Sequence, residues 1–326
     1  MKSLIEFSME EKKVELNLGL VCNNFCKFCM NDEPLKKRRF VSSEILKKEL
    51  RDFRKKGCNA VGFLGGEPTI YPGLIEIIEL ASKIGYQGIH LVSNGRKYKD
   101  RDFLQRLISS GATRFYVSIH SHRPEIEDFL TSVKGGFKEK IKGISNLVFL
   151  KKGGLIKDNI LLNSVINKYN YRYLPNIIFF FRKNFGLTDF RFNFIQPAGR
   201  ALKNYNILVP KYLEIKKHLW EAIDLSRQLG VNLCLEAIPF CFLHGVKKFE
   251  ELIGEFKDGK RQARFGSEQR EGFFIETRRK ETLKIKGKNC KKCIYNDDCE
   301  GPWKNYVDFY DFHELKPIRM ANHRDK

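Results

Sequence analysis

The sequence predicts an α/β protein, a partial (β/α)6 barrel of the TIM type followed by a small cysteine-rich C-terminal domain. Three observations support this. Strand-like and helix-like segments alternate six times between residues 14 and 199. Polar motifs directly follow the predicted strand ends, where parallel barrels keep their chemistry. After residue 205 the alternation changes, and the last part of the chain gathers cysteines.

The predicted strands are short apolar runs, and the predicted helices have one apolar face. The strands are expected at residues 14–21, 60–66, 88–95, 114–121, 159–170 and 189–199. The helices are expected at residues 41–57, 71–85, 102–111, 137–154 and 173–186. Ser42 or Ser43 should cap the first helix, and Pro72 should lie in the first turn of the second. Such an alternation gives a parallel sheet covered by helices.

The chain divides into three predicted regions. Residues 1–205 form the barrel, residues 206–240 a bridging helix and strand, and residues 241–326 the cysteine-rich domain. The charged stretch 247–289 is expected to be a lid, a hairpin or poorly ordered. The aromatic residues after position 301 are expected to pack the tail against the barrel mouth, with a stacking platform for a base as the alternative.

Composition limits the class of protein. The formal charge is +21, from 60 basic and 39 acidic residues, which attracts polyanions or simply reflects a lysine-rich surface. The N-terminus lacks the apolar region of a signal peptide, and no apolar run is long enough to span a membrane. We therefore expect a cytoplasmic protein, in which clustered thiols indicate metal or redox chemistry rather than disulfides.

The first cysteine cluster is C-x3-C-x2-C, formed by Cys22, Cys26 and Cys29 directly after the first predicted strand. Thiolates suit zinc and iron–sulfur clusters. Structural zinc requires four ligands, and no histidine lies nearby in the loop. Three thiolates on a four-iron cluster would instead leave one iron open to hold a small ligand.

A second motif, "GGEPT", follows the next predicted strand. Gly65 and Gly66 allow a close backbone approach, and Glu67 offers an acceptor for an ammonium group. The motif alone is also compatible with a tight turn. Because both motifs follow neighbouring strands, we expect them to face one pocket.

The order of "CNNFCKFC" and "LGGEPT" resembles the radical S-adenosylmethionine (SAM) superfamily. The resemblance covers roughly residues 14–200. It implies that Cys22, Cys26 and Cys29 hold a [4Fe–4S] cluster whose open iron binds SAM, with Phe28 beside the cluster. It also implies a SAM-amine motif and an electron donor such as flavodoxin or ferredoxin. The residues of that motif are Gly65, Gly66, Glu67 and Pro68.

Other polar residues at strand ends resemble SAM-pocket or substrate-facing positions, with a polar cap of the strand end as the alternative. They are Ser93, Asn94, Ser118, Asn163 and Gln196. His120 is a further candidate, as a proton donor or acceptor.

The tail carries C-x2-C-x5-C at Cys290, Cys293 and Cys299, a spacing that resembles the SPASM and twitch auxiliary-cluster domains of radical SAM enzymes. A full SPASM pattern continues with another cysteine where this chain has Trp303. We expect Cys241 to complete a four-cysteine set for a second [4Fe–4S] cluster, with zinc as the alternative. Cys58 and Cys234 are expected to be core residues.

The resemblance implies reductive cleavage of SAM to a 5′-deoxyadenosyl radical that abstracts hydrogen from a substrate. A peptide or protein is the first candidate substrate. RNA or a small metabolite or cofactor precursor is the alternative. The alternative from another class is a non-catalytic zinc or iron–sulfur protein that binds nucleic acid, which the charge would suit.

Overall fold

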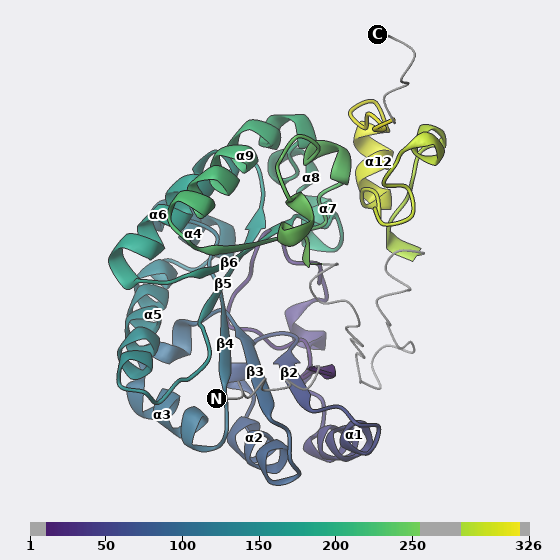
Figure 1. The fold of residues 1–326 in the computed structure, drawn as a ribbon. Coiled ribbons are helices and arrows are strands. Elements are labelled where there is room, and N and C mark those ends of the chain that lie inside the picture. Colours follow the sequence, from purple (N-terminus) through teal and green to yellow (C-terminus); the bar gives the residue numbers. More distant parts are fainter. Residues whose placement is uncertain (1–10, 255–281, 320–326) are drawn as a thin grey trace, which may run out of the picture.

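A seven-stranded parallel sheet is the centre of the fold in the computed structural model, which describes residues 11–254 and 282–319 (Figure 1). The strands follow one another in chain order across the sheet, so β1 and β7 are its edges. Their bounds are β1 Lys13–Asn17, β2 Ala60–Leu64, β3 Gly88–Ser93, β4 Arg114–Ser118, β5 Leu161–Ile166, β6 Asp189–Phe194 and β7 Asn232–Glu236. The predicted α/β partial barrel is therefore confirmed, and the strand expected in the bridging region joins the sheet as β7.

Helices cover the outer face of the curved sheet, as Figure 1 shows. Their bounds are α1 Ser43–Lys55, α2 Leu74–Lys83, α3 Arg101–Ser109, α4 Pro124–Thr131, α5 Gly136–Lys152, α6 Leu174–Phe185 and α9 Tyr212–Gln228. Two one-turn helices, α7 Arg200–Lys203 and α8 Tyr205–Leu208, follow β6. Helix α4 was not predicted, because its eight residues hold only one apolar i, i+3, i+4 set, formed by Ile126, Phe129 and Leu130, which is short for a helix prediction.

The first βα unit forms for the reasons that the sequence suggests. The hydroxyl oxygen of Ser42 accepts a hydrogen bond from the N–H of Ile45 at the start of α1. Leu46, Leu50 and Phe53 are buried on one face of that helix. Burial of each such side chain stabilises the fold by about 1.5–3 kcal/mol.

The predicted start of the second helix is wrong. α2 begins at Leu74, with Gly73 as its N-cap, so Pro72 lies before the helix. Tyr71 explains the difference, because its ring is buried and its hydroxyl donates to the carbonyl oxygen of Val41 (3.1 Å). This anchor keeps residues 71–73 in the loop.

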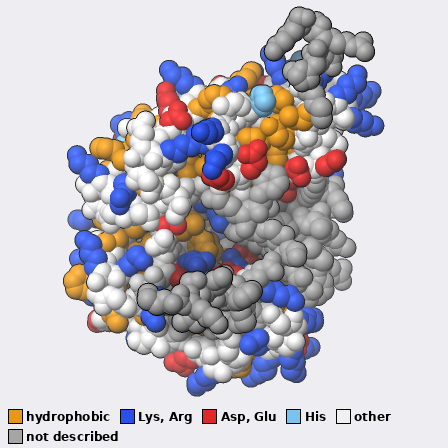
Figure 2. Space-filling model, viewed as in Figure 1, with side chains coloured by type: hydrophobic (Ala, Val, Ile, Leu, Met, Phe, Trp, Pro, Cys, Tyr) orange, Lys and Arg blue, Asp and Glu red, His pale blue; other side chains and the backbone are white. Residues whose placement is uncertain are grey.

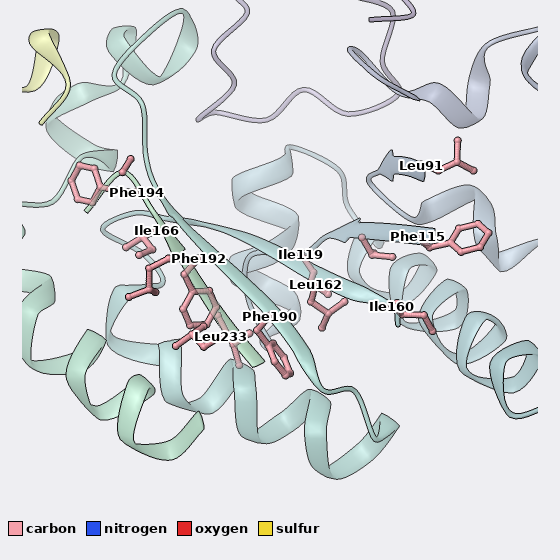
Figure 3. Packing of buried hydrophobic residues seen from close by; sticks show 14 of the residues in the cluster. Leu91, Phe115, Ile119, Ile160, Leu162, Ile166, Phe190, Phe192, Phe194 and Leu233 are labelled. Carbon is pink, nitrogen blue, oxygen red and sulfur yellow. The ribbon is translucent and has the colours of Figure 1, made fainter. Parts of the chain in front are cut away.

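Side chains alternate between the two faces of the sheet. In β6, Phe190, Phe192 and Phe194 are buried against the helices, as Figure 3 shows together with Leu162 and Ile166 of β5. The intervening residues of β5 and β6 lie on the opposite, inner face and are partly exposed. We call this inner face the lumen. It carries polar residues, among them Asn163, Arg191 and Asn193.

The described part of the tail packs on the end of the barrel beside α7 and α8 (Figure 1). Its elements are η5 Phe240–Phe242, η6 Phe249–Leu252, η8 Lys288–Lys292 and α12 Lys304–Tyr310. Tyr306 of α12 is buried, and its hydroxyl accepts a hydrogen bond from the N–H of Tyr212 at the start of α9 (3.1 Å). Glu314 accepts from the same N–H and from that of Leu213. The aromatic tail residues therefore pack against the barrel end, as predicted.

Two further predictions concern the charged stretch 247–289 and membrane-spanning segments. The stretch 247–289, expected as a lid or hairpin, lies largely outside them. In the part of the chain that the structure describes, no helix is long and apolar enough to cross a membrane.

Candidate functional site

Cys22, Cys26 and Cys29 lie on the loop between β1 and α1, and all three are partly exposed. β1 was predicted to end at residue 21, but it ends at Asn17. The Asn17 side-chain oxygen accepts a hydrogen bond from the N–H of Gly19 (2.9 Å), and Gly19 has a φ of 117°. This turn stops the strand and begins the cysteine loop.

The segment after β6 holds one side of the cysteine loop. The Nε of Arg200 donates to the carbonyl oxygen of Cys26 (2.8 Å), and its backbone N–H donates to that of Cys29 (2.9 Å). The side-chain amide of Asn204 donates to the carbonyl oxygen of Lys27 (3.1 Å). Sequence reasoning missed Arg200 and Asn204, because no local pattern relates them to a loop about 170 residues earlier.

The other side of the cysteine loop is bonded to the C-terminal end of α4. The N–H groups of Phe25 and Lys27 donate to the carbonyl oxygens of Thr131 (3.1 Å) and Leu130 (2.9 Å). These carbonyls belong to the last turn of a helix, where they have no partner within the helix. The unpredicted α4 therefore positions the loop that carries the cysteines.

The two glycines of "GGEPT" touch the cysteine loop. The N–H of Gly66 donates to the carbonyl oxygen of Gly19 (2.7 Å), and that of Glu67 donates to the carbonyl oxygen of Val21 (2.8 Å). A Cβ atom on Gly66 would lie 2.0 Å from the Val21 oxygen, and Gly65 has a φ of 125°. The glycines thus bring the two motifs together through the backbone.

Glu67 is buried, and four donors hold its carboxylate. One oxygen accepts from the N–H of Thr69 (3.0 Å), from the hydroxyl of Thr69 and from the hydroxyl of Ser93 (2.7 Å). The other oxygen accepts from the N–H of Asn94 (2.7 Å) alone. Because a carboxylate oxygen has two lone pairs, this second oxygen has room for another donor.

Asn94 also connects β3 to the cysteine loop. Its side-chain amide donates to the side-chain oxygen of Asn23 (2.7 Å). Arg96 donates to the carbonyl oxygen of Asn23 (2.7 Å) and to the side-chain oxygen of Asn24 (2.9 Å). Ser93 and Asn94 therefore position Glu67 and the loop, a role that strand-end position alone did not reveal.

His120 lies against Phe28, with ring centroids 4.4 Å apart. Its Nδ1 accepts a hydrogen bond from the N–H of Val165 (3.1 Å), and burial lowers its pKa from 6.5 to about 4. The ring is therefore neutral at physiological pH and carries its proton on Nε2. It packs Phe28 in place behind the cysteine loop.

A buried ion pair lies beneath the loop. The Lys140 ammonium of α5 contacts Glu127 of α4 at 2.5 Å, and both side chains are almost fully buried. Although burial alone would raise it, Lys140 and neighbouring hydrogen bonds keep the pKa of Glu127 below its usual range. The second Glu127 oxygen accepts from the N–H groups of His120 (2.7 Å) and Ser121 (3.0 Å).

Burial raises the pKa of Cys22 to about 11 and that of Cys26 to about 12. For Cys26 the nearby Lys140 ammonium opposes this rise. Without a metal both thiols are protonated at neutral pH, so metal ligation at these positions must release protons.

The three remaining strand-end candidates lie at or near the lumen. Ser118 ends β4 and is the register neighbour of Asn163 in β5. The Asn163 side-chain oxygen accepts a hydrogen bond from the Asn193 amide (2.6 Å). Gln196 is partly exposed just beyond β6. Asn193 was missed by the sequence reasoning, and its own side-chain oxygen is buried without a hydrogen-bond partner.

Four tail cysteines line one cavity. Cys241 comes from η5, Cys290 from η8, and Cys293 and Cys299 from the loop that follows. The thiol of Cys299 accepts a backbone hydrogen bond from Gly301 (3.4 Å). The structure therefore brings Cys241 together with the three later cysteines, and their role as metal ligands stays a prediction.

Cys58 and Cys234 are buried, with exposed fractions of 2% and 8%. Neither is among the residues that line the cavity of the tail cysteines. Within residues 11–254 and 282–319, no three Cys, His, Asp or Glu side chains lie close enough to hold a single metal ion. The first cysteine set is therefore defined by its common loop, and the tail set by its common cavity.

The surroundings of the cysteine loop suit an anionic, sulfur-rich cluster. The guanidinium groups of Arg38 and Arg200 lie on the Phe25 ring, with distances of 5.3 and 4.0 Å to its centroid. Each has one buried terminal nitrogen without a hydrogen-bond partner, Nη2 of Arg38 and Nη1 of Arg200. Unpaired buried donors beside three thiols fit a thiolate-bound iron–sulfur group.

Residues 16–168 match the model of the radical SAM superfamily. The chain is 32% identical over 191 residues to the GTP 3′,8-cyclase of Aquifex aeolicus, covering 57% of each protein. It is 27% identical over 226 residues to a probable GTP 3′,8-cyclase of Saccharolobus islandicus (strain M.14.25), covering 68% of this chain and 69% of that protein.

Two solved structures share the fold. Streptococcus suis SuiB bound to precursor peptide SuiA superposes with a TM-score of 0.64 at 15% identity, covering 92% of this chain and 73% of SuiB. The anSMEcpe structure with bound AdoMet and the Cp18Cys peptide superposes with a TM-score of 0.56 at 16% identity, covering 94% of this chain and 92% of anSMEcpe. Radical SAM enzymes use a [4Fe–4S] cluster and SAM. Over residues 16–168 the chain is therefore similar to the radical SAM superfamily of enzymes.

Proposed function

We propose that Cys22, Cys26 and Cys29 bind the [4Fe–4S] cluster and that Glu67 receives the amino group of SAM. The supporting observation is the backbone junction of the two motifs, in which Gly66 and Glu67 bond to Gly19 and Val21. This junction brings a buried carboxylate with one free acceptor position next to the loop of the three thiols. Phe28, Gly65 and Pro68 complete the proposed pocket.

When bound, the cluster and SAM would supply a one-electron cleavage of SAM that yields a 5′-deoxyadenosyl radical. The chain's own residues orient and shield the reactants. Ser93 and Asn94 fix the Glu67 carboxylate, so the acceptor for the SAM amine does not have to reorganise on binding. Arg200 and the end of α4 fix the cysteine loop from two sides.

The lumen carries balanced charge among the described residues. The Lys13 ammonium pairs with Glu15 (2.9 Å), and the Arg191 guanidinium pairs with Glu236 (3.3 Å). Both cations also lie over the ring of Tyr116, at 5.5 and 5.9 Å from its centroid. These two pairs therefore meet at one aromatic ring on the inner face. Figure 2 shows a hollow on the viewed face in which basic, acidic and apolar side chains lie together.

We infer that the substrate group held in the lumen is neutral and bears an N–H or O–H donor. The buried oxygen of Asn193 supports this inference, because an unpaired acceptor favours a ligand that supplies a donor. The cations of the described lumen are already paired with carboxylates. A peptide segment, with its neutral amide groups, fits these properties, and Ser118, Asn163 and Gln196 are the proposed contacts.

Hydrogen transfer tests the substrate class. The reconstituted enzyme is incubated under anaerobic conditions with dithionite, SAM and deuterated peptides encoded beside its gene. Deuterium in 5′-deoxyadenosine, measured by mass spectrometry, is the expected result for the peptide that is the substrate. If only non-peptide compounds transfer deuterium, the peptide proposal is wrong while the radical chemistry stands.

A second candidate is action on GTP or a similar cofactor precursor. The matches to GTP 3′,8-cyclases, over 191 and 226 residues, favour it. Consumption of GTP with transfer of its deuterium to 5′-deoxyadenosine would support this candidate. We rank this candidate second because Lys13 and Arg191 of the described lumen are already paired with carboxylates, whereas a triphosphate favours unpaired cations.

We also propose that Cys241, Cys290, Cys293 and Cys299 hold a second [4Fe–4S] cluster as an auxiliary site. The shared cavity supports this assignment. With four thiolate ligands this cluster would have no open iron, so it would carry electrons rather than bind substrate. Zinc in the same ligand set is the alternative, for which the four thiols would have to move closer together, and metal analysis separates the two.

A further inference from the structure

The outer surface of the cysteine loop carries exposed apolar side chains. Phe25 is 44% exposed, Met30 59% and Leu35 64%. Phe25 directly precedes Cys26, and Met30 directly follows Cys29. These apolar groups therefore lie on the same short loop as the proposed cluster ligands.

Basic residues surround these apolar groups. Lys36 and Lys37 form the exposed turn η1 Leu35–Lys37, and Arg39 is exposed beside it. On the other side, Lys203 is exposed at the end of α7. Residues 25–39 and 199–204 together contain seven Lys or Arg residues and two acidic residues. We call the exposed residues Phe25, Met30, Leu35, Lys36, Lys37, Arg39 and Lys203 the loop patch.

Specific contacts make the loop patch one continuous surface. Arg38 and Arg200 flank the Phe25 ring and connect the segment around η1 to the segment after β6. Lys203 pairs with Asp32 (3.0 Å), so α7 also contacts the middle of the cysteine loop. A Cβ atom on Gly199 would lie 2.1 Å from the Met30 carbonyl oxygen, which shows how closely the two segments approach.

We propose that the loop patch is the docking surface for an acidic one-electron carrier, a reduced flavodoxin or ferredoxin. This inference rests on the proposed role of Cys22, Cys26 and Cys29 as cluster ligands. In each encounter the carrier is oxidised by one electron and the cluster is reduced by one, and no bond is made or broken.

The composition of the loop patch fits this partner. Aromatic residues, Met and Arg are enriched at protein interfaces, and a basic rim speeds the approach of an acidic protein. Interfaces of electron-transfer pairs are small and transient, so a few exposed side chains around a charged rim suffice. The position of the patch provides the short path that electron transfer to the loop requires.

Charge reversal at η1 tests the proposal. The holoenzyme with Lys36→Glu and Lys37→Glu is compared with wild type for SAM cleavage driven either by dithionite or by flavodoxin that its reductase keeps reduced. The matched control is the double variant Lys48→Glu and Lys217→Glu, which changes exposed lysines on α1 and α9 by the same total charge.

The η1 variant is expected to raise the KM for flavodoxin roughly tenfold, because like charges then oppose the acidic carrier. Its dithionite-driven rate should stay at the wild-type level. Salt should raise the wild-type KM for flavodoxin and affect that of the η1 variant much less, because screening removes steering. Leu35→Ser should also raise this KM without affecting the dithionite-driven rate.

The docking proposal is overturned if the η1 variant responds to flavodoxin as the control variant does. It is also overturned if the dithionite-driven rate falls together with the flavodoxin-driven rate, since η1 would then act on the cluster itself. Failure of the proposed function looks different, because wild type would then cleave no SAM even with dithionite.

Discussion

The Nε of Arg200 donates a 2.8 Å hydrogen bond to the carbonyl oxygen of Cys26, across 174 residues of chain. The Arg200 guanidinium also lies over the ring of Phe25. Besides the Cys26 carbonyl, the carbonyl of Cys29 accepts from the backbone N–H of Arg200, and that of Lys27 accepts from the side-chain amide of Asn204. The loop that carries Cys22, Cys26 and Cys29 is therefore held by the segment after β6. This contact joins the first and last parts of the barrel.

Arg200→Lys should weaken this attachment, because an ammonium cannot reproduce the planar stack and the directed Nε–H bond. The Cys26 carbonyl oxygen keeps its bond from the N–H of Cys29 (3.2 Å), so the loss is one hydrogen bond to a charged group, about 1.5–3 kcal/mol. We expect a lower melting temperature of the metal-free protein and less iron per chain after reconstitution. Arg182→Lys, at the exposed end of α6, is the matched control and should change neither quantity. Equal iron content in the two variants would contradict the proposed role of Arg200.

Glu67→Gln should weaken SAM binding at least tenfold, roughly the loss of one charge-assisted hydrogen bond. The amide keeps the shape of the side chain but removes the negative charge. Its NH2 group would also face the donors of Ser93, Thr69 or Asn94. Isothermal titration with SAM measures the effect. The control, Glu76→Gln on α2, changes a glutamate with a 61% exposed side chain. Unchanged SAM affinity in Glu67→Gln would show that the amine binds elsewhere.

Lys140→Met should destabilise the protein by about 3–5 kcal/mol, because it leaves the buried Glu127 carboxylate without its cation. The double variant Lys140→Met and Glu127→Gln removes both charges and should recover part of the loss. Urea unfolding of the metal-free protein measures both values. A single variant as stable as wild type would mean that Glu127 is protonated or solvated in the native state.

His120 should make stability depend on pH between about 4 and 6.5. Its pKa is lowered by burial from 6.5 to about 4, so below 6.5 the unfolded chain takes up a proton that the folded chain does not. Stability from this group is therefore complete above pH 6.5 and falls as the pH decreases toward 4, by about 3 kcal/mol at most. The nearby charges are Glu127 and Lys140.

The measurement is the free energy of unfolding of wild type and His120→Asn over this pH range. The difference between the two proteins should shrink as the pH falls. A constant difference from pH 4 to 7 would contradict a neutral, buried His120.

Cys241→Ser should remove or destabilise the auxiliary site and leave the cluster of the cysteine loop in place. For two four-iron clusters the iron content should fall from about eight to about four per chain. Loss of zinc with unchanged iron would instead identify a zinc site. Cys58→Ser and Cys234→Ser are matched controls, because both thiols lie outside the cavity. Unchanged metal content in Cys241→Ser would exclude Cys241 as a ligand.

Local patterns predicted the α/β partial barrel, and they located the two motifs that the fold brings together. The burial of Leu46 and Leu50 follows from helical periodicity. The apolar runs located the strands, but each strand ends two to five residues before its predicted end. The cysteine spacing and the glycine–glutamate motif indicated the radical SAM similarity that residues 16–168 show, because both motifs are short in sequence.

Contacts between distant segments were not predictable in this way. Nothing near Arg200 indicates a partner at Cys26, and nothing near Lys140 indicates that it meets Glu127 in the interior. Ser93 and Asn94 were found by position, but their bonds to Glu67 depend on the register between β2 and β3. Such contacts arise from packing of the whole barrel, which a local pattern does not contain.

Reductive cleavage of SAM tests the central claim most directly. The anaerobically reconstituted wild-type enzyme is incubated with SAM and dithionite, and 5′-deoxyadenosine is quantified by liquid chromatography. We predict formation of 5′-deoxyadenosine and methionine in equal amounts, and none with Cys26→Ala. If fully iron-loaded wild-type enzyme forms no 5′-deoxyadenosine, or if Cys26→Ala forms as much as wild type, the account of this site is contradicted.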